Sequence, residues 1–117
     1  MLYELRSYDI RPERWDDYLN WAYTTAWPIL FEAHGFPLVG WWQVVPNADE
    51  PPSSTNLQWI LAWESEEQRN ERWAALLDDD AWKAAVAATR DPASGDRLYH
   101  LRTRYRFLRP LPRSPLQ

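Results

Sequence analysis

The stretch that decides the fold is Leu2-Tyr-Glu-Leu-Arg-Ser-Tyr-Asp-Ile-Arg-Pro-Glu-Arg-Trp15. Residues 2–10 alternate in character with the period of a β-strand, in which neighbouring side chains point to opposite faces. Pro12 then supplies the fixed φ of a first helical position, and Glu13 adds an acid to the first turn. The stretch therefore predicts a strand that runs directly into a helix.

The predicted first helix has an interruption inside it. Apolar residues recur at helical spacing from Trp15 to Ala33, and Gly35 follows as the residue that ends the helix. Pro28 lies within this pattern, where it removes a backbone amide and clashes with the preceding turn. The sequence therefore predicts a kink or break near residues 23–27.

The second half of the chain repeats the order of strand and helix. Ser65 and Gln68 form a capping box, which starts a helix with Arg69, Trp73, Leu76 and Leu77 on one side. The further elements expected are strands over residues 38–45, 57–64 and 98–109, a polar loop over 46–55 and a short helix over 81–89. The order β-α-β-β-α-β predicts an α+β protein with a ferredoxin-like subunit and an antiparallel four-stranded sheet.

Such a sheet carries helices on one face only. The other face bears aromatic and aliphatic side chains that are unfavourable in water, so it needs a cover. Face-to-face pairing of two sheets is the simplest cover, and the sequence therefore predicts a homodimer.

Composition limits the class of protein. A chain of 117 residues with 45% hydrophobic residues is one soluble domain. It has no Cys, which excludes disulfides and thiolate chemistry, and no apolar run approaches the roughly 20 residues of a membrane span. No signal peptide is recognisable, so we expect a cytoplasmic protein without a membrane partner. Of the 13 basic residues only Lys83 is Lys, which is typical of a GC-rich bacterial genome.

Charge is unevenly distributed along the chain. Residues 97–117 contain six Arg and no acid, whereas residues 1–96 contain 7 basic and 17 acidic residues. A basic tail can bind nucleic acid. The overall net charge of −4 and the period-two spacing of Arg102, Arg104 and Arg106 instead favour acidic partners within the subunit or its dimer mate. We expect no nucleic-acid partner.

These motifs together resemble the NIPSNAP-like members of the dimeric α+β barrel superfamily. The stretches that carry the resemblance are 2–8 with Arg11-Pro12, Leu38-Val-Gly-Trp41, Trp59-Ile-Leu-Ala-Trp-Glu-Ser65, Arg69, Arg72, Leu77-Asp-Asp-Asp-Ala-Trp82 and Arg106-Phe-Leu-Arg-Pro110. The resemblance implies a dimeric α+β barrel domain over residues 1–110 and a C-terminal tail over 111–117. It also implies a cavity in each subunit between the helices and the sheet. The superfamily hosts several chemistries, so the fold alone does not choose a reaction.

The nine Trp residues are the most unusual part of the composition. They fit two interpretations: packing of the core and dimer seam, or the walls of a ligand pocket. For a pocket beneath the interrupted first helix, the predicted substrate-binding residues are Tyr23, Trp27 and Trp63.

The predicted catalytic residues are His34, Glu4 and Arg6. His34 is either a cap of the first helix or a proton-transfer group. Glu4 and Arg6 share a strand face, where a buried pair could orient an acidic oxygen. The alternative is a cross-strand ion pair of this face with Arg102 or Arg104.

No cofactor is predicted. Two isolated His make a poor metal site, three Gly cannot build a phosphate-binding loop, and the first strand lacks the Asn expected of haem-degrading relatives. Two functions remain. One is a cofactor-independent enzyme acting on an aromatic or polycyclic metabolite by proton transfer, isomerisation, cyclisation or oxygenation. The other is a non-catalytic ligand-binding or assembly protein.

Overall fold

The computed structural model describes all 117 residues of the chain. Its four strands are β1 (Leu2–Ile10), β2 (Leu38–Gln43), β3 (Leu57–Trp63) and β4 (His100–Leu108). They form one antiparallel sheet in the order β2-β3-β1-β4. The predicted ferredoxin-like βαββαβ arrangement is confirmed, and β3 is central because its residues are apolar on both faces.

The first helical arm, residues 12–33, is continuous. It consists of η1 (Pro12–Arg14), α1 (Trp15–Trp21) and two π-helical segments, η2 (Ala22–Ala26) and η3 (Pro28–Ala33). The amide of Trp27 donates to the carbonyl of Ala22, and the amide of His34 to that of Ile29, each five residues back. Of the predicted kink or break, a break is wrong: the helix is widened over these residues, and the wider turns accommodate Pro28, which has no amide to donate.

The arm ends as the sequence predicts. Gly35 has a φ of 62°, a left-handed conformation that favours glycine. The next amide, of Phe36, donates back to the carbonyl of Leu30 over 3.0 Å. This closure turns the chain sharply toward β2.

The second helical arm, residues 66–87, consists of α2 (Glu66–Asp78) and α3 (Asp80–Ala87). The Ser65 hydroxyl accepts from the amide of Gln68 over 3.0 Å, which confirms the predicted cap. Asp79 caps α3 by accepting from the amide of Ala81 over 2.8 Å. Leu77 does not face the core as expected, since it is 60% exposed on the solvent side of α2.

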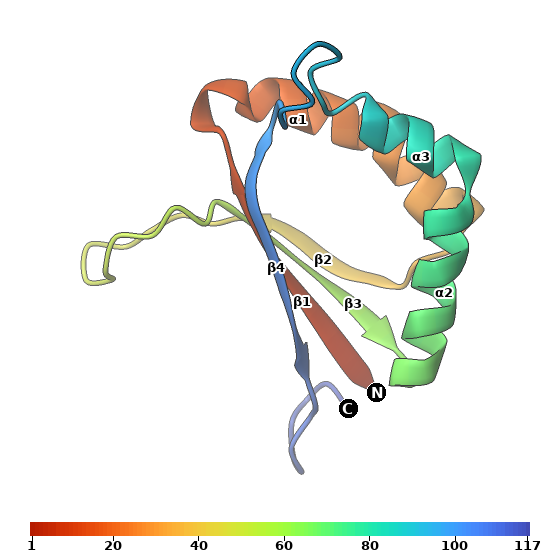
Figure 1. Ribbon diagram of the computed structural model, residues 1–117. Coiled ribbons are helices and arrows are strands. Elements are labelled where there is room, and N and C mark those ends of the chain that lie inside the picture. Colours follow the sequence, from red (N-terminus) through yellow and green to blue (C-terminus); the bar gives the residue numbers. More distant parts are fainter.

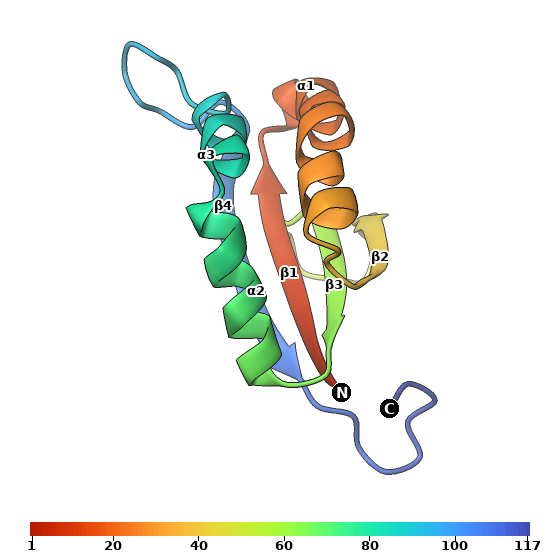
Figure 2. The same ribbon diagram turned by 90° about the vertical axis from the view of Figure 1, so that its right-hand side faces the viewer.

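Both arms cover the same face of the sheet (Figure 1). They lie side by side, with β1 visible between them (Figure 2). A cluster of 13 buried hydrophobic residues fills the space between the arms and the sheet. The opposite face carries no helix, and strand register places on it Tyr3, Leu5, Trp42, Ile60 and Leu108.

A bulge changes the phase of β4 near its start. Arg102 pairs with Asp9, but the next residue of β1, Ile10, pairs with His100. Leu101 is therefore the extra residue, and it is 51% exposed. The bulge turns the His100 side chain to the helix-covered face of the sheet.

The loop between β2 and β3 is fastened to the end of β1. The Asn56 side chain accepts from the amide of Ile10 and donates to its carbonyl, over 2.9 and 2.8 Å. Asp9 accepts from the hydroxyls of Ser54 and Thr55 over 2.7 and 2.9 Å. None of the helices is long and apolar enough to cross a membrane.

Candidate functional site

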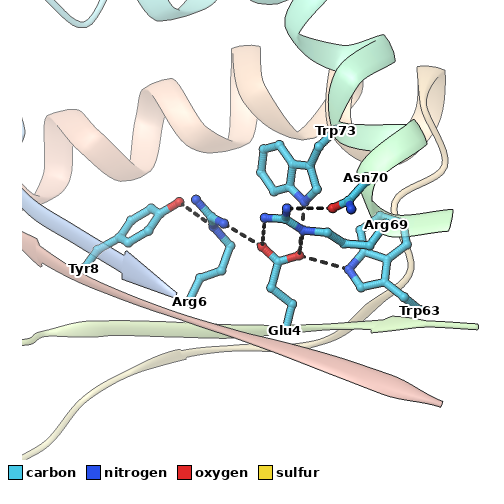
Figure 3. A network of polar contacts seen from close by, with 7 residues as sticks. All are labelled: Glu4, Arg6, Tyr8, Trp63, Arg69, Asn70 and Trp73. Atoms are coloured by element: carbon cyan, nitrogen blue, oxygen red, sulfur yellow. Dashed lines mark hydrogen bonds and ion pairs between the residues drawn. The ribbon is translucent and has the colours of Figure 1, made fainter. Parts of the chain in front are cut away.

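The centre of the polar network is the carboxylate of Glu4, which is fully buried. It accepts five hydrogen bonds, drawn in Figure 3, from four side chains. Oε1 accepts from the indoles of Trp63 and Trp73 and from Nε of Arg69, at 2.9–3.0 Å. Oε2 accepts from Arg6 at 2.6 Å and from Nη2 of Arg69 at 3.1 Å. No acceptor capacity remains for a ligand.

Local structure explains how these groups meet. Strand alternation places Glu4 and Arg6 on the helix-covered face of β1. Arg69 and Trp73 are four residues apart on α2, so they share the helix side that faces the sheet. Burial opposes ionisation of Glu4, but hydrogen bonds from Arg69 and the charge of Arg6 outweigh it and hold the pKa of Glu4 below 4.5.

Arg6 is held on one side only. Its Nε donates to the hydroxyl of Tyr8 over 3.0 Å, and its Nη1 donates to Glu4. Its guanidinium carbon lies 4.6 Å from the ring centre of Trp73 and 5.6 Å from that of Trp59. The second terminal nitrogen, Nη2, has no partner in the protein and carries no dashed line in Figure 3. Burial opposes the charge of Arg6, but its neighbours, Tyr8 first and then Glu4, outweigh burial and raise its pKa.

A partly open cavity of about 180 Å³ adjoins Arg6, between the two helical arms and the sheet. Six of the nine Trp residues line it, namely Trp21, Trp27, Trp41, Trp59, Trp73 and Trp82. Tyr8 and Tyr18 complete the aromatic wall. The first arm contributes from its π-helical segments, and such segments are frequent at functional sites.

His100 also lines this cavity. Its imidazole packs edge-on against Tyr18, Tyr8 and Trp21, with ring centres 5.2–6.1 Å apart. Burial, together with the charges of Arg97 and Arg90, lowers the pKa of His100 to about 4. His100 is therefore neutral at pH 7, and no protein group hydrogen-bonds to its imidazole.

Two cavity-lining indoles lack partners. The Nε1 atoms of Trp27 and Trp59 are buried without a hydrogen-bond acceptor. By contrast, Trp21 Nε1 donates to the carbonyl of Ala85 over 3.1 Å, and Trp73 Nε1 donates to Glu4. Most buried polar groups in proteins are paired, so two orphans in one cavity wall call for a functional explanation.

The predicted site residues separate into two groups. Arg6 and Trp27 line the cavity. Glu4 and Trp63 are fully buried beside it and bond to each other over 3.0 Å. Tyr23 lies on the outer side of the first arm, 49% exposed, where its ring packs edge-on against Trp27.

His34 lies away from the cavity, at the junction of the two arms. Its Nε2 is 2.7 Å from Oδ2 of Asp79, and its carbonyl accepts from Arg72. These contacts fasten the end of the first arm to the turn between α2 and α3. This geometry matches the structural alternative for His34, a contact at the helix end.

The expected ion pair of Glu4 with Arg102 or Arg104 is wrong. Arg104 pairs with Ser7 across the strands and so points to the helix-free face, where it lies 3.5 Å from Asp9. Glu4 points to the other face and takes Arg69 instead. No group of three or more His, Asp or Glu side chains is arranged so that it could hold a metal ion.

The structure adds residues that sequence reasoning missed. Arg69 and Trp73 complete the Glu4 network, and His100, Arg90 and Arg97 join the cavity. The helical spacing of Arg69 and Trp73 was a usable signal, because both face inward with Leu76. His100 gave no such signal, since its orientation depends on the bulge.

Solved structures with this fold share almost the whole chain. A NIPSNAP family protein from Agrobacterium tumefaciens is 24% identical, with a TM-score of 0.77 and coverage of 99% of this chain and 98% of that one. An uncharacterized NIPSNAP domain protein from Burkholderia xenovorans is 20% identical, with a TM-score of 0.76 and coverage of 98% and 99%. A NIPSNAP-like domain protein from the same organism is 22% identical, with a TM-score of 0.73 and coverage of 97% and 88%. These likenesses establish the α+β fold.

The family model NIPSNAP matches residues 3–115. The chain therefore belongs to the NIPSNAP family. None of the curated proteins matches it.

Proposed function

We propose that the protein binds a small aromatic metabolite in the Trp-lined cavity and transforms it by proton transfer. The observation that carries this proposal is the distribution of Trp. Six of nine line the cavity, whereas register places Trp42 alone on the helix-free face. Packing of a dimer seam would need the opposite distribution. Aromatic walls of this kind hold planar ligands by stacking.

The size of the cavity supports a small ligand. A closed apolar cavity of about 150 Å³ accepts a benzene ring. The present cavity, at about 180 Å³ and partly open, suits one or two fused rings. Larger polycyclic compounds would have to extend through its mouth.

Two lining residues supply the proposed chemistry. His100, neutral at pH 7, removes a proton from a carbon next to a carbonyl group of the ligand. The electron pair of the broken C–H bond moves to the carbonyl oxygen, where the positive charge of Arg6 stabilises the resulting oxyanion. In a ligand with a double bond next to the broken C–H bond, the enolate is a conjugated dienolate, and return of the proton from His100 to its γ-carbon moves the double bond and completes an isomerisation. Such a step needs no external oxidant or reductant, and we place it in the cytoplasm.

The experiment is a screen of one- and two-ring aromatic ketones and acids by quenching of Trp fluorescence, followed by NMR of the hits in D₂O. We expect the protein to exchange an acidic C–H of a bound ligand for deuterium. His100→Gln should lose exchange by about 10²-fold or more while binding persists. The matched control is His34→Gln, the other His, which lies outside the cavity and should retain exchange.

The alternative function, a non-catalytic ligand-binding protein, predicts binding without exchange in the wild type. A screen in which no aromatic compound quenches fluorescence would contradict both.

We also propose that the protein acts as a homodimer. The helix-free face carries Leu5 and Ile60, which are half-buried, and it exposes Leu108 at 41% and Trp42 at 48%. A face of this kind is unfavourable in water. We expect an interface above the standard range of roughly 1,200–2,000 Å². Sedimentation equilibrium at micromolar concentration should give twice the chain mass of 14.0 kDa, and Leu5→Glu should shift it toward the monomer. A wild-type monomer would refute the proposal.

A further inference from the structure

Building on the proposed function, we propose that the cavity selects a one- or two-ring aromatic carboxylate, and that Arg6 binds the carboxylate with its unpaired terminal nitrogen. The proposal concerns the charge of the ligand, which the aromatic walls alone do not determine. It rests on the charges around the cavity, on its unpaired donors and on the way Arg6 is fixed.

All charged residues that line the cavity are basic. They are Arg6, Arg90 and Arg97, and no Asp or Glu lines it. Glu4 lies beneath Arg6, but it is shared with Arg69, whose Nε is 2.9 Å from Oε1. One carboxylate between two guanidiniums leaves a net positive charge in a buried place. A bound anion would compensate this charge, because charges interact strongly where water is excluded.

The cavity also has a surplus of hydrogen-bond donors. The Nε1 atoms of Trp27 and Trp59 are buried without an acceptor. Nη2 of Arg6, whose side chain is 14% exposed, has no acceptor in the protein either. Trp59 lies close to Arg6, with 5.6 Å between its ring centre and the guanidinium carbon. An unpaired buried donor is destabilising, so a ligand that brings acceptor oxygens has an advantage over an apolar one.

Arg6 is fixed in a position to use this advantage. Glu4 and Tyr8 hold two of its nitrogens, and the rings of Trp73 and Trp59 flank its plane. A guanidinium fixed in this way binds a carboxylate oxygen with little loss of side-chain freedom. Arg90 and Arg97 are exposed and add a positive entrance that attracts anions.

Within each ring system, the test compares ligands whose substituent differs in charge. Calorimetric titration would use 2-naphthoate, 2-naphthamide and 2-naphthylmethylamine, with benzoate and benzamide as the one-ring pair. We expect each acid to bind at least tenfold more tightly than its amide, and the amine to bind most weakly. Equal affinities for acid and amide would overturn the inference and leave the proposed function standing. Failure of all five compounds to bind would instead contradict the proposed function.

Variants assign the selectivity to residues. Arg6→Met should remove the preference for acid over amide, and Arg6→Lys, which keeps the charge but loses the guanidinium geometry, should retain part of it. The double change Arg90→Gln with Arg97→Gln should weaken acid binding a few-fold and reduce its salt dependence, since exposed charges are screened. Lys83→Gln removes an exposed charge from α3 outside the cavity and is the matched control. Full acid selectivity in a folded Arg6→Met, checked by circular dichroism, would overturn the role of Arg6.

Discussion

Glu4→Gln is the most informative single change for the fold. Gln has the shape of Glu but replaces one oxygen by an NH₂ group, which donates. Placed at Oε2, this group faces Nη1 of Arg6 and Nη2 of Arg69, which are donors as well. Two charge-assisted hydrogen bonds are then lost, and two buried guanidiniums remain without an anion.

The expected cost follows from these losses. A hydrogen bond to a charged group is worth about 1.5–3 kcal/mol, and breaking a buried ion pair from one side costs about 3–5 kcal/mol. We therefore expect Glu4→Gln to lower the free energy of unfolding by about 3–5 kcal/mol. That is a large share of the roughly 5–15 kcal/mol that a domain of this size has.

Urea denaturation followed by circular dichroism measures this cost, at one fixed protein concentration because dimerisation would contribute. Circular dichroism is preferable to fluorescence, since Trp63 and Trp73 contact the changed group. The matched control is Glu71→Gln, an exposed acid of α2 without a partner, which should stay within about 0.5 kcal/mol.

The effect should depend on pH. Because the pKa of Glu4 is lowered below 4.5 in the folded state, the Glu4 carboxylate becomes protonated at a higher pH in the unfolded chain than in the folded protein. The stabilisation is therefore complete above pH 4.5 and is lost as pH falls through the folded pKa. The difference between wild type and Glu4→Gln should shrink in that range. A cost no greater than that of Glu71→Gln at pH 7 would refute the reasoning.

Three further predictions concern single contacts. His100 should titrate with a pKa of about 4 by imidazole NMR, and a normal pKa near 6.5 would contradict its burial. Because the unfolded chain binds this proton at a higher pH, the free energy of unfolding should fall as pH drops from 6.5 toward 4, and His100→Phe should flatten that part of the profile. His34→Ala, which breaks the contact with Asp79, should lower the melting temperature without changing ligand affinity, and a loss of affinity in the folded variant would place His34 in the site. Ser65→Ala removes the acceptor for Gln68 and should cost about 1 kcal/mol in urea denaturation, whereas Ser65→Asp should restore most of it.

Local sequence patterns predicted most of the fold. The alternation over residues 2–10 gave the bounds of β1, and Ser65 with Gln68 gave the start of α2. Pro28 correctly indicated that the first helix is irregular, but it did not predict that the irregular part is π-helical. Both a π-helical turn and a break accommodate a residue without an amide, and the sequence pattern does not distinguish them.

The site was less predictable because its contacts are not local. Arg69 and Glu4 are 65 positions apart, and strand alternation alone leaves the buried face of β1 undetermined. His100 illustrates the second difficulty. Strand alternation counted back from Phe107 in steps of two places Leu101, not His100, on the helix-covered face. Only the bulge moves His100 to that face. A bulge arises from the register of two strands and has no signature in one of them.

The Glu4 network joins the stability of the fold to the proposed binding of an anion. If Arg6 were the only partner of Glu4, the two charges would cancel, and the pair would give the cavity no net charge. Arg69 changes this balance, since it supplies two of the five hydrogen bonds to Glu4 and a second positive charge. The carboxylate is thereby occupied from the α2 side, while Arg6 keeps a free nitrogen and a positive charge. A buried acid between two guanidiniums thus fixes a cation at a cavity wall, where a lone Arg would be both mobile and costly to bury.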